Sequence, residues 1–346
     1  MLAGTGTAGA YHAGVLRALR EAGVRIDLVA GRGMGAASAL FAAADADPRL
    51  WDAQGLWTHV EHPQRLYAWR LPWRLLAGGV GAAFACMALP LALALGLALV
   101  YPLVYLLLLV APSVGAGVAD AYAAAVGRLL STGVLLNAVP RAVMAALLVA
   151  FAAAFVTGAL GAWRSRGRRS MGGFWWAGLG APVDAAAAAA WLRAGFWRYL
   201  RGVANVAEPP VRDLGQRYVE LLRENLGQPG YRELLLVVHD LDARGDLVFG
   251  MVAEGWRTGF VEGGGEAGRA REVFDLAGVA GGHAFDLLAG ALAVGPVCES
   301  AVLTFSQEGP WRGETHRLVD RPPALRRVPE ECLQAGAPRG VLGAPR

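Results

Sequence analysis

The fold is decided by one stretch near the start of the chain, "GTGTAGAYHAGVLRALREAGVRIDLVAGRGMGAASAL", residues Gly4 to Leu40. It opens with glycines in the spacing G-x-G-x-x-G, at Gly4, Gly6 and Gly9. Apolar residues at helical spacing follow over 10–22, and a largely apolar run over 24–31 then ends in glycine. The order of glycine loop, helix, strand, tight turn and helix predicts an α/β domain with a parallel sheet.

A glycine loop before a helix presents backbone N–H groups to an anion, which leaves two interpretations. A dinucleotide site needs an acidic residue at the end of the second strand to bind the ribose. In this sequence Asp27 stands near the start of that strand, and Arg32 stands at its end. The confirming residue of a dinucleotide site is therefore missing.

The second interpretation is an ester hydrolase. "GRGMG", Gly31 to Gly35, has the flanking glycines, the preceding strand and the following helix of a G-x-S-x-G nucleophile elbow. The central residue is Gly33 instead of serine. Glycine tolerates the positive φ of such a turn but carries no nucleophile. Ser38 and His12 lie on helices, where we expect packing roles for both.

Composition narrows the class of protein. The chain has 346 residues, of which 55% are hydrophobic and 17% charged, and it carries a net charge of +4. So apolar a chain suggests membrane segments. Cys86, Cys298 and Cys332 form no C-x-x-C pair, so neither disulfides nor zinc are indicated. We expect no cofactor, no bound metal, including at His239, Asp240 and Asp242, and no nucleic-acid partner.

Two uncharged stretches are long enough to cross a bilayer. Residues 75–119 hold 45 uncharged positions and residues 142–163 hold 22, where one span needs about 20. Arginines flank both stretches, at Arg70 and Arg74 and in "RSRGRR" over 164–169. Both flanks are therefore expected in the cytoplasm, with an even number of crossings. Two crossings are favoured; four remain open if Pro90 and Pro102 turn a hairpin.

The second half of the chain has soluble character. A helix capped by Asp184 is expected after Pro182, with its tryptophans either at the membrane surface or packed on the soluble domain. Helices are predicted over 211–227 and 274–293, and strands over 234–238, 246–252, 301–306 and 315–321. A polar loop is predicted over 263–272.

The stretch from Gly4 to Gly31, together with "HDLDARGDLVF" over 239–249, resembles the patatin-like phospholipase family. The resemblance covers roughly the first 50 and the last 130 residues. It implies a patatin-like three-layer α/β/α domain, formed by 1–70 and 206–346, interrupted by a membrane-spanning and interfacial insertion over 71–205.

The family's chemistry is acyl ester hydrolysis by a Ser–Asp dyad, with the glycine loop binding the oxyanion. The resemblance places Gly4, Thr5, Gly6 and Gly9 in that loop, with Ala8 in place of the family's arginine. Gly33 takes the elbow position. Asp320 in "RLVDRPP" is the best match to the dyad aspartate, although a solvated surface role is the simpler interpretation for an aspartate.

Two functions follow from the resemblance. One is a membrane-bound lipid acyl ester hydrolase of weak or lost activity; the other is a catalytically silent lipid-binding or scaffold protein. A dinucleotide-binding oxidoreductase is a distant third. Membrane lipids are the expected partners, and the oligomeric state is open. If the elbow is intact, Gly33→Ser is expected to restore weak esterase activity that Asp320→Asn abolishes.

Overall fold

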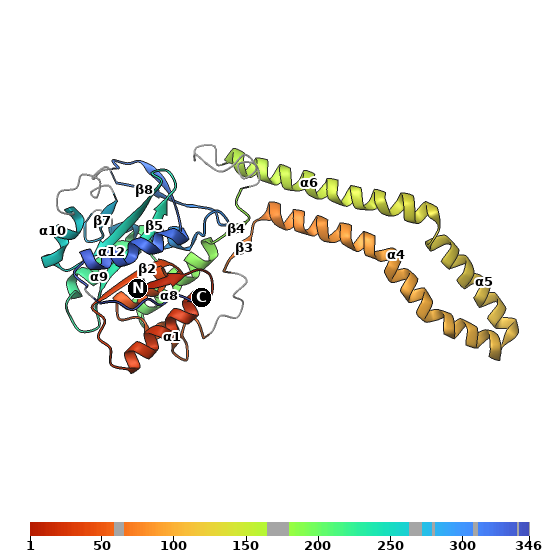
Figure 1. Ribbon diagram of the computed structural model, residues 1–346, viewed down its shortest axis with the longest axis horizontal. Helices are drawn as coiled ribbons and strands as arrows, with labels where there is room; N and C mark the ends of the chain where they lie inside the picture. The colour runs from red at the N-terminus through yellow and green to blue at the C-terminus, as the bar shows by residue number, and fades with distance from the viewer. Residues whose placement is uncertain are drawn as a thin grey trace. The chain divides into compact units, whose positions relative to one another are not determined.

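The computed structural model divides the chain into two compact units. Unit 1 is Met1–Ala68 with Val183–Arg346, and unit 2 is Trp69–Pro182. The structure describes residues 1–58, 66–164, 180–262, 272–278, 281–306, 311–337 and 339–345 (Figure 1). The arginine run after Arg164 and most of the predicted polar loop over 263–272 lie outside these ranges.

Unit 1 is built on one seven-stranded sheet. Its strands are β1 (Leu2–Gly4), β2 (Leu28–Gly33), β5 (Glu233–Asp240), β6 (Gly245–Met251), β7 (Val273–Asp275), β8 (Ala301–Thr304) and β9 (Thr315–Val319). Its α-helices are α1 (Ala8–Glu21), α2 (Met34–Ala43), α3 (Pro48–Trp51), α8 (Ala186–Arg201), α9 (Val211–Asn225), α10 (Glu254–Glu262), α11 (Ala284–Leu292) and α12 (Arg327–Gln334). Short 3-10 turns, η5 (Gly281–His283) and η6 (Pro322–Arg326), precede α11 and α12, and β3 (Ala68–Trp69) pairs with β4 (Val183–Asp184).

The sheet is mixed, where the sequence predicted a parallel one. β1, β2 and β5 run parallel, as expected from the first 40 residues. A short turn after Asp240 then sends β6 back antiparallel to β5, and β9 also pairs antiparallel with β5. β7 is parallel to β6, and β8 is antiparallel to β9.

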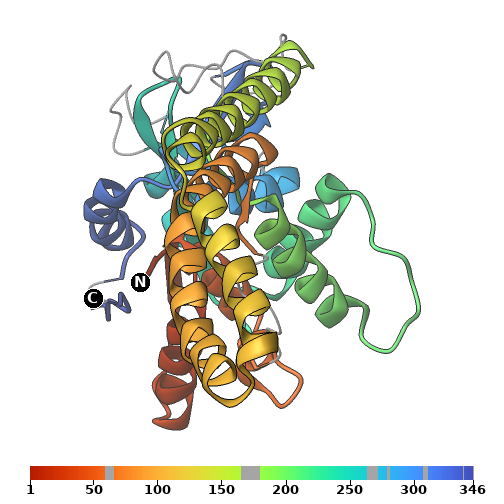
Figure 2. The ribbon, with the colours of Figure 1, turned by 90° about the vertical axis from the view of Figure 1, so that its right-hand side faces the viewer.

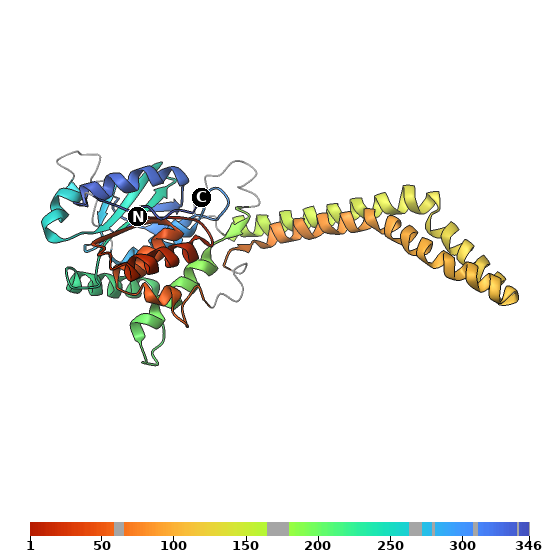
Figure 3. The ribbon, with the colours of Figure 1, turned by 60° about the horizontal axis from the view of Figure 1, so that its bottom comes forward.

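Helices cover both faces of this sheet, and the alternation of side chains along β5 shows how. Leu234, Leu236 and Val238 face a large core formed with α1, α2, α8, α9 and α11. Leu235 and Val237 face a smaller core formed with α10 and α12. Figures 1 and 3 show α12 and α1 on opposite sides of the strands. Unit 1 therefore has an α/β/α arrangement, as the family resemblance implied.

Most predicted elements of unit 1 are confirmed, with two exceptions. The helix predicted over 274–293 is wrong in its first half, where β7 and a turn precede α11. The helix after Asp184 is present as α8, but it belongs to unit 1 and not to an insertion reaching residue 205. Phe196 of α8 contacts the rings of Phe41 and Tyr218 at centroid distances of 5.2 and 5.0 Å. Of the tryptophans, Trp191 contacts the Trp57 ring at a centroid distance of 5.2 Å and Trp197 is buried, so these two pack on unit 1, whereas Trp175 and Trp176 lie outside the described residues.

Unit 2 is a helical hairpin of α4 (Leu71–Val110), α5 (Pro112–Leu129), the π-helix η2 (Val134–Ala138) and α6 (Val139–Arg164). Figure 2 shows α4 and α5 side by side as orange and yellow ribbons. Residues 71–110 and 136–160 are long and apolar enough to cross a membrane by length and composition. α4 continues through Pro90 and Pro102 without reversing, so these prolines do not turn the hairpin that four crossings would require.

Small residues hold α4 against α6. A Cβ atom added to Gly79 would lie 2.0 Å from the Cβ of Ala150, so only glycine permits this approach. Ala83 and Ala154, each four residues further along its helix, are buried in the hairpin. This small-xxx-small pattern is typical of helix pairs that pack in lipid.

Candidate functional site

The sheet topology brings together two residues that lie 287 positions apart in the sequence, Gly33 and Asp320. β5 is longer than β2. Its residues 233–237 pair with β2, and its last two residues pair with β9 on the same side. Both registers converge on Val238, so the end of β2 meets the end of β9 there. The antiparallel return of β9, which the local sequence pattern does not reveal, therefore places Asp320 beside the predicted elbow.

Gly33 occupies a tight turn between β2 and α2, with φ 59° and ψ −137°. The flanking glycines are needed for this turn. A Cβ at Gly31 would lie 2.4 Å from the carbonyl oxygen of Gly35, and one at Gly35 would lie 2.0 Å from that of Leu2. The strand, turn and helix thus have the backbone form of a nucleophile elbow, with no side chain at its centre.

Space for a side chain at position 33 is also missing. A Cβ built on Gly33 would lie 3.0 Å from Asp320 Oδ2 and only 2.2 Å from the carbonyl oxygen of Gly4. The expectation that Gly33→Ser restores weak esterase activity leaves out this overlap, because the Gly4 backbone would have to move before a serine could fit.

Asp320 is buried, at 1% exposure, so the interpretation as a solvated surface aspartate is wrong. Its carboxylate accepts two hydrogen bonds from Arg32, at 2.9 Å from Nε and 2.6 Å from Nη2. Burial raises the pKa of Asp320, and the hydrogen bonds and charge of Arg32 offset part of that rise. The acid beside the elbow is thus already paired with a buried cation.

Arg32 is the partner that sequence reasoning missed. It lies at the end of β2, directly before Gly33, and its side chain is only 6% exposed. A buried arginine requires a carboxylate or several carbonyl partners, because an unpaired buried charge is costly. The sequence signal for a buried, paired arginine was its position between Gly31 and Gly33 at the end of an apolar strand. Pairing it with Asp320 required the tertiary fold.

The glycine loop differs from the expected oxyanion loop at two positions. Gly4 is the last residue of β1 and turns its carbonyl oxygen, not its N–H, toward the position above Gly33. Gly9 lies inside α1, where a Cβ would be 2.0 Å from the Trp57 ring, so its role here is close packing. Thr5, Gly6 and Thr7 form the remaining loop, and an oxyanion role for it stays a prediction.

Tyr67 is a second residue that sequence reasoning missed. Its hydroxyl donates a long, 3.5 Å hydrogen bond to the carbonyl of Leu292. Burial is the main cause that raises its pKa, whereas a hydrogen bond with the Gly6 backbone lowers it.

The histidines that the sequence singled out, His12 and His239, have structural partners. His12 is fully buried, with Nε2 3.0 Å from the Ala3 carbonyl, and burial lowers its pKa. Its Nδ1 lies 3.4 Å from Ser38 Oγ, so both residues join α1 to α2. His239 pairs with Asp246 at 2.6 Å.

Asp240 and Asp242 are likewise paired. Asp240 lies 2.5 Å from His316 Nδ1, and Asp242 binds Arg317. Among the residues described, no group of His, Cys, Asp and Glu is arranged to hold a metal ion.

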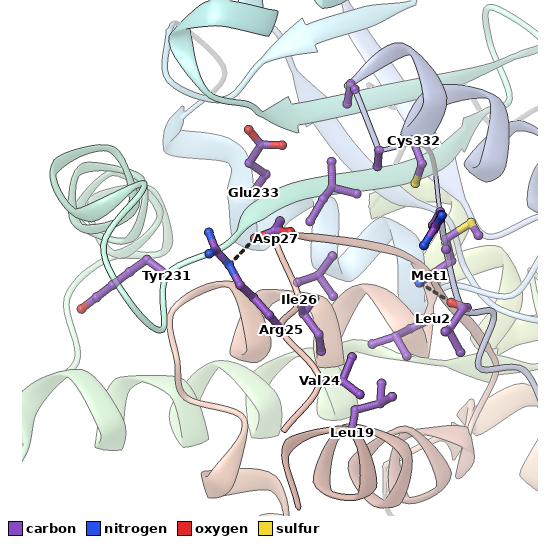
Figure 4. A pocket seen from close by; sticks show the side chains of 18 of the residues that line it. Met1, Leu2, Leu19, Val24, Arg25, Ile26, Asp27, Tyr231, Glu233 and Cys332 are labelled. Atoms are coloured by element: carbon purple, nitrogen blue, oxygen red, sulfur yellow. Dashed lines mark hydrogen bonds and ion pairs between the residues drawn. The ribbon is translucent and has the colours of Figure 1, made fainter. Parts of the chain in front are cut away.

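A cavity lies at the amino-terminal ends of β2 and β5 (Figure 4). It has a volume of about 1200 Å³ and is lined by residues from the starts of β2 and β5, including Leu28 and Glu233, and by α1 and α12. Neither Gly33 nor Asp320 lines it. Open α/β sheets bind ligands at the carboxyl ends of their strands, which is the edge of Gly33. The cavity is therefore separate from the elbow.

With this geometry in place, comparison with known proteins gives one finding. Residues 1–201 match the family model described as "Patatin-like phospholipase", so the chain belongs to the patatin-like phospholipase family. The matched range includes unit 2 and ends before β5 and β9, so Asp320 lies outside it. No curated protein and no solved structure matches the chain.

Proposed function

We propose that this chain is a membrane-anchored, lipid-binding member of its phospholipase family that forms no acyl-enzyme at the elbow. The observation that carries the proposal is the environment of Gly33. The elbow has no nucleophile, the Gly4 carbonyl oxygen blocks the position that a side chain would take, and Arg32 holds Asp320 in a buried ion pair. A developing oxyanion would meet the Gly4 carbonyl oxygen, which repels negative charge.

The ion pair also argues against a base at this site. A general base must be free to accept a proton at the reacting atom. In Asp320 both carboxylate oxygens accept hydrogen bonds from Arg32. Each oxygen keeps a second lone pair for a water molecule, but the charge and hydrogen bonds of Arg32 favour the ionised carboxylate and so reduce its basicity.

The test uses the purified full-length chain, a fluorophosphonate probe and a short-chain phospholipid below its micellar concentration. We expect no covalent labelling and no release of fatty acid. We also expect a higher thermal midpoint with the lipid than with its deacylated headgroup, because a ligand that binds only the folded state stabilises it.

The competing function, ester hydrolysis, would show itself as fatty acid release from the unmodified chain. If Asp320→Asn left that release unchanged, the chemistry would lie at another site. Saturable binding of NAD or NADP would instead support the dinucleotide interpretation.

The second part of the proposal is that unit 2 anchors the protein in a membrane, with unit 1 in the cytoplasm. Two helices of sufficient length and hydropathy support this, as do the exposed apolar side chains along α4 and α6. We expect the protein to resist carbonate extraction. Tags at the N-terminus and at Arg168 should report the same side of the membrane, since an even number of crossings requires it. Tags on opposite sides would refute that topology.

A further inference from the structure

Unit 2 is too long for a simple pair of crossings. α4 has 40 residues, which at 1.5 Å per residue is about 60 Å, whereas the hydrocarbon core of a bilayer is about 30 Å thick. We propose that unit 2 has two parts, a base that crosses the bilayer and a tip that lies along the opposite lipid surface. The base is residues 71–90 of α4 with α6, and the tip is residues 91–110 of α4 with α5. The inference rests on the membrane anchoring proposed above.

Charged residues mark the two ends of the base. α6 carries no charge from Ala142 to Trp163, which is 22 residues or about 33 Å. Arg141 precedes this stretch and is exposed. The Gly79–Ala150 contact fixes the register of the two antiparallel helices, so Pro90, eleven residues after Gly79, lies level with Val139. Arg141 is thus close to the level of Pro90, where the opposite headgroup region would begin.

Both legs of the hairpin are weakened at this same level. Pro90 has no N–H to donate to the Cys86 carbonyl, which weakens α4 there. On the return leg, α5 ends at Leu129, and the π-helix Val134–Ala138 precedes α6. Figures 1 and 3 show both legs changing direction where α6 gives way to α5. The tip can therefore tilt against the base without breaking the contacts within either part.

The tip has the chemistry of a lipid surface. Its α4 segment exposes large apolar side chains, such as Leu99 and Leu103 at 71% and 69% exposure. Contact of so many apolar side chains with water is unfavourable, so they mark a surface that contacts lipid. Its other helix, α5, carries Asp120 at its centre. An aspartate there costs roughly 2.5–3.5 kcal/mol in a helix that crosses a bilayer, which disfavours a third and fourth crossing.

Tyrosines add to this interfacial character. Tyr101 and Tyr105 of α4 and Tyr122 of α5 all lie in the tip, with the rings of Tyr101 and Tyr122 at a centroid distance of 6.1 Å. The Tyr122 hydroxyl donates to the Leu97 carbonyl at 2.8 Å and so ties α5 to α4. Tyrosine is enriched where one end of a side chain is in lipid and the other in water. α5 also carries charge at Asp120 and Arg128, whereas residues 91–110 of α4 carry none, so the pair combines an apolar segment with charged groups, as helices at a lipid–water boundary do.

The experiment labels single cysteines with a membrane-impermeant maleimide in sealed vesicles of both orientations. Ser113→Cys lies at the turn of the hairpin, Ser131→Cys at the level of Pro90, and Leu103→Cys on the apolar side of the tip. The unsubstituted chain serves as the blank for the native cysteines. We expect Ser113→Cys and Ser131→Cys to react only from the non-cytoplasmic side, and Leu103→Cys to react at least tenfold more slowly than Ser113→Cys.

Each other outcome overturns the inference in a distinct way. Labelling of Ser113→Cys from the cytoplasmic side would mean four crossings. Equal rates at Leu103→Cys and Ser113→Cys would place the tip in water. Slow labelling of Leu103→Cys that becomes fast on dilution of the protein in the membrane would mean that a second copy covers it. Loss of the protein on carbonate extraction would instead refute the membrane anchor itself.

Discussion

Removing Arg32 tests most directly whether the Arg32–Asp320 ion pair stabilises the elbow. In the unmodified protein both side chains of the pair are at most 6% exposed. Arg32→Met therefore leaves the Asp320 carboxylate buried without its cationic partner. Breaking one side of a buried ion pair costs about 3–5 kcal/mol. For a domain of the size of unit 1, this corresponds to a fall of roughly 6–20 °C in the thermal midpoint, measured by tryptophan fluorescence on the full chain in detergent.

A double-mutant cycle separates the pair from the packing around it. Adding Asp320→Asn to Arg32→Met removes the stranded charge, so we expect most of the lost stability to return. Arg25→Met is the matched control, because the Arg25–Asp27 pair is exposed, at 90% and 73%. Its loss should change stability by less than about 1 kcal/mol.

The pH dependence gives an independent check, with a definite sign. Burial raises the pKa of Asp320 and Arg32 offsets part of that rise, so Arg32→Met should raise the folded-state pKa further. A folded state that binds its proton more tightly than the unfolded state gains stability as the pH falls through the folded pKa. The deficit of Arg32→Met should therefore shrink on acidification, by at most about 1.4 kcal/mol per pH unit. A deficit that is constant with pH, or a double variant no more stable than Arg32→Met, would refute the reasoning.

Three further predictions concern glycines. Gly33→Ser should destabilise the full chain by roughly 2–6 kcal/mol, because backbone strain adds to the overlap with the Gly4 carbonyl. The variant should also remain unlabelled by a fluorophosphonate probe. Strong labelling would show that the Gly4 loop moves easily. Gly9→Ala should cost about 1–3 kcal/mol because its Cβ would meet an indole ring, whereas Gly14→Ala in the same helix, with open space around it, should stabilise by about 0.5–1 kcal/mol. Gly79→Ala should lower the thermal midpoint of the full chain in detergent, by the equivalent of about 1–3 kcal/mol, because its Cβ would lie 2.0 Å from that of Ala150. Gly81→Ala, with open space around it, is the matched control and should not lower the midpoint.

The sequence by itself determined the elements and their class. Helical spacing after the first glycine loop, the apolar run ending at Gly31 and the alternation along 234–238 depend on local side-chain periodicity, which a sequence displays directly. The glycines at 31 and 35 were recognised for the same reason, because a tight strand-to-helix turn leaves no room for a Cβ atom. The sequence also shows directly that position 33 carries no nucleophile, because the residue there is glycine.

Only the tertiary structure decided what surrounds that position. Asp320 reaches Gly33 because β9 returns antiparallel and takes over the pairing of β5 where β2 ends, and no local pattern encodes that exchange. The same long-range assembly pairs Arg32 with Asp320. It also packs Gly9 against the Trp57 ring, where no side chain would fit. A sequence specifies which groups are present along each strand, but burial and charge pairing arise only when distant strands are brought side by side.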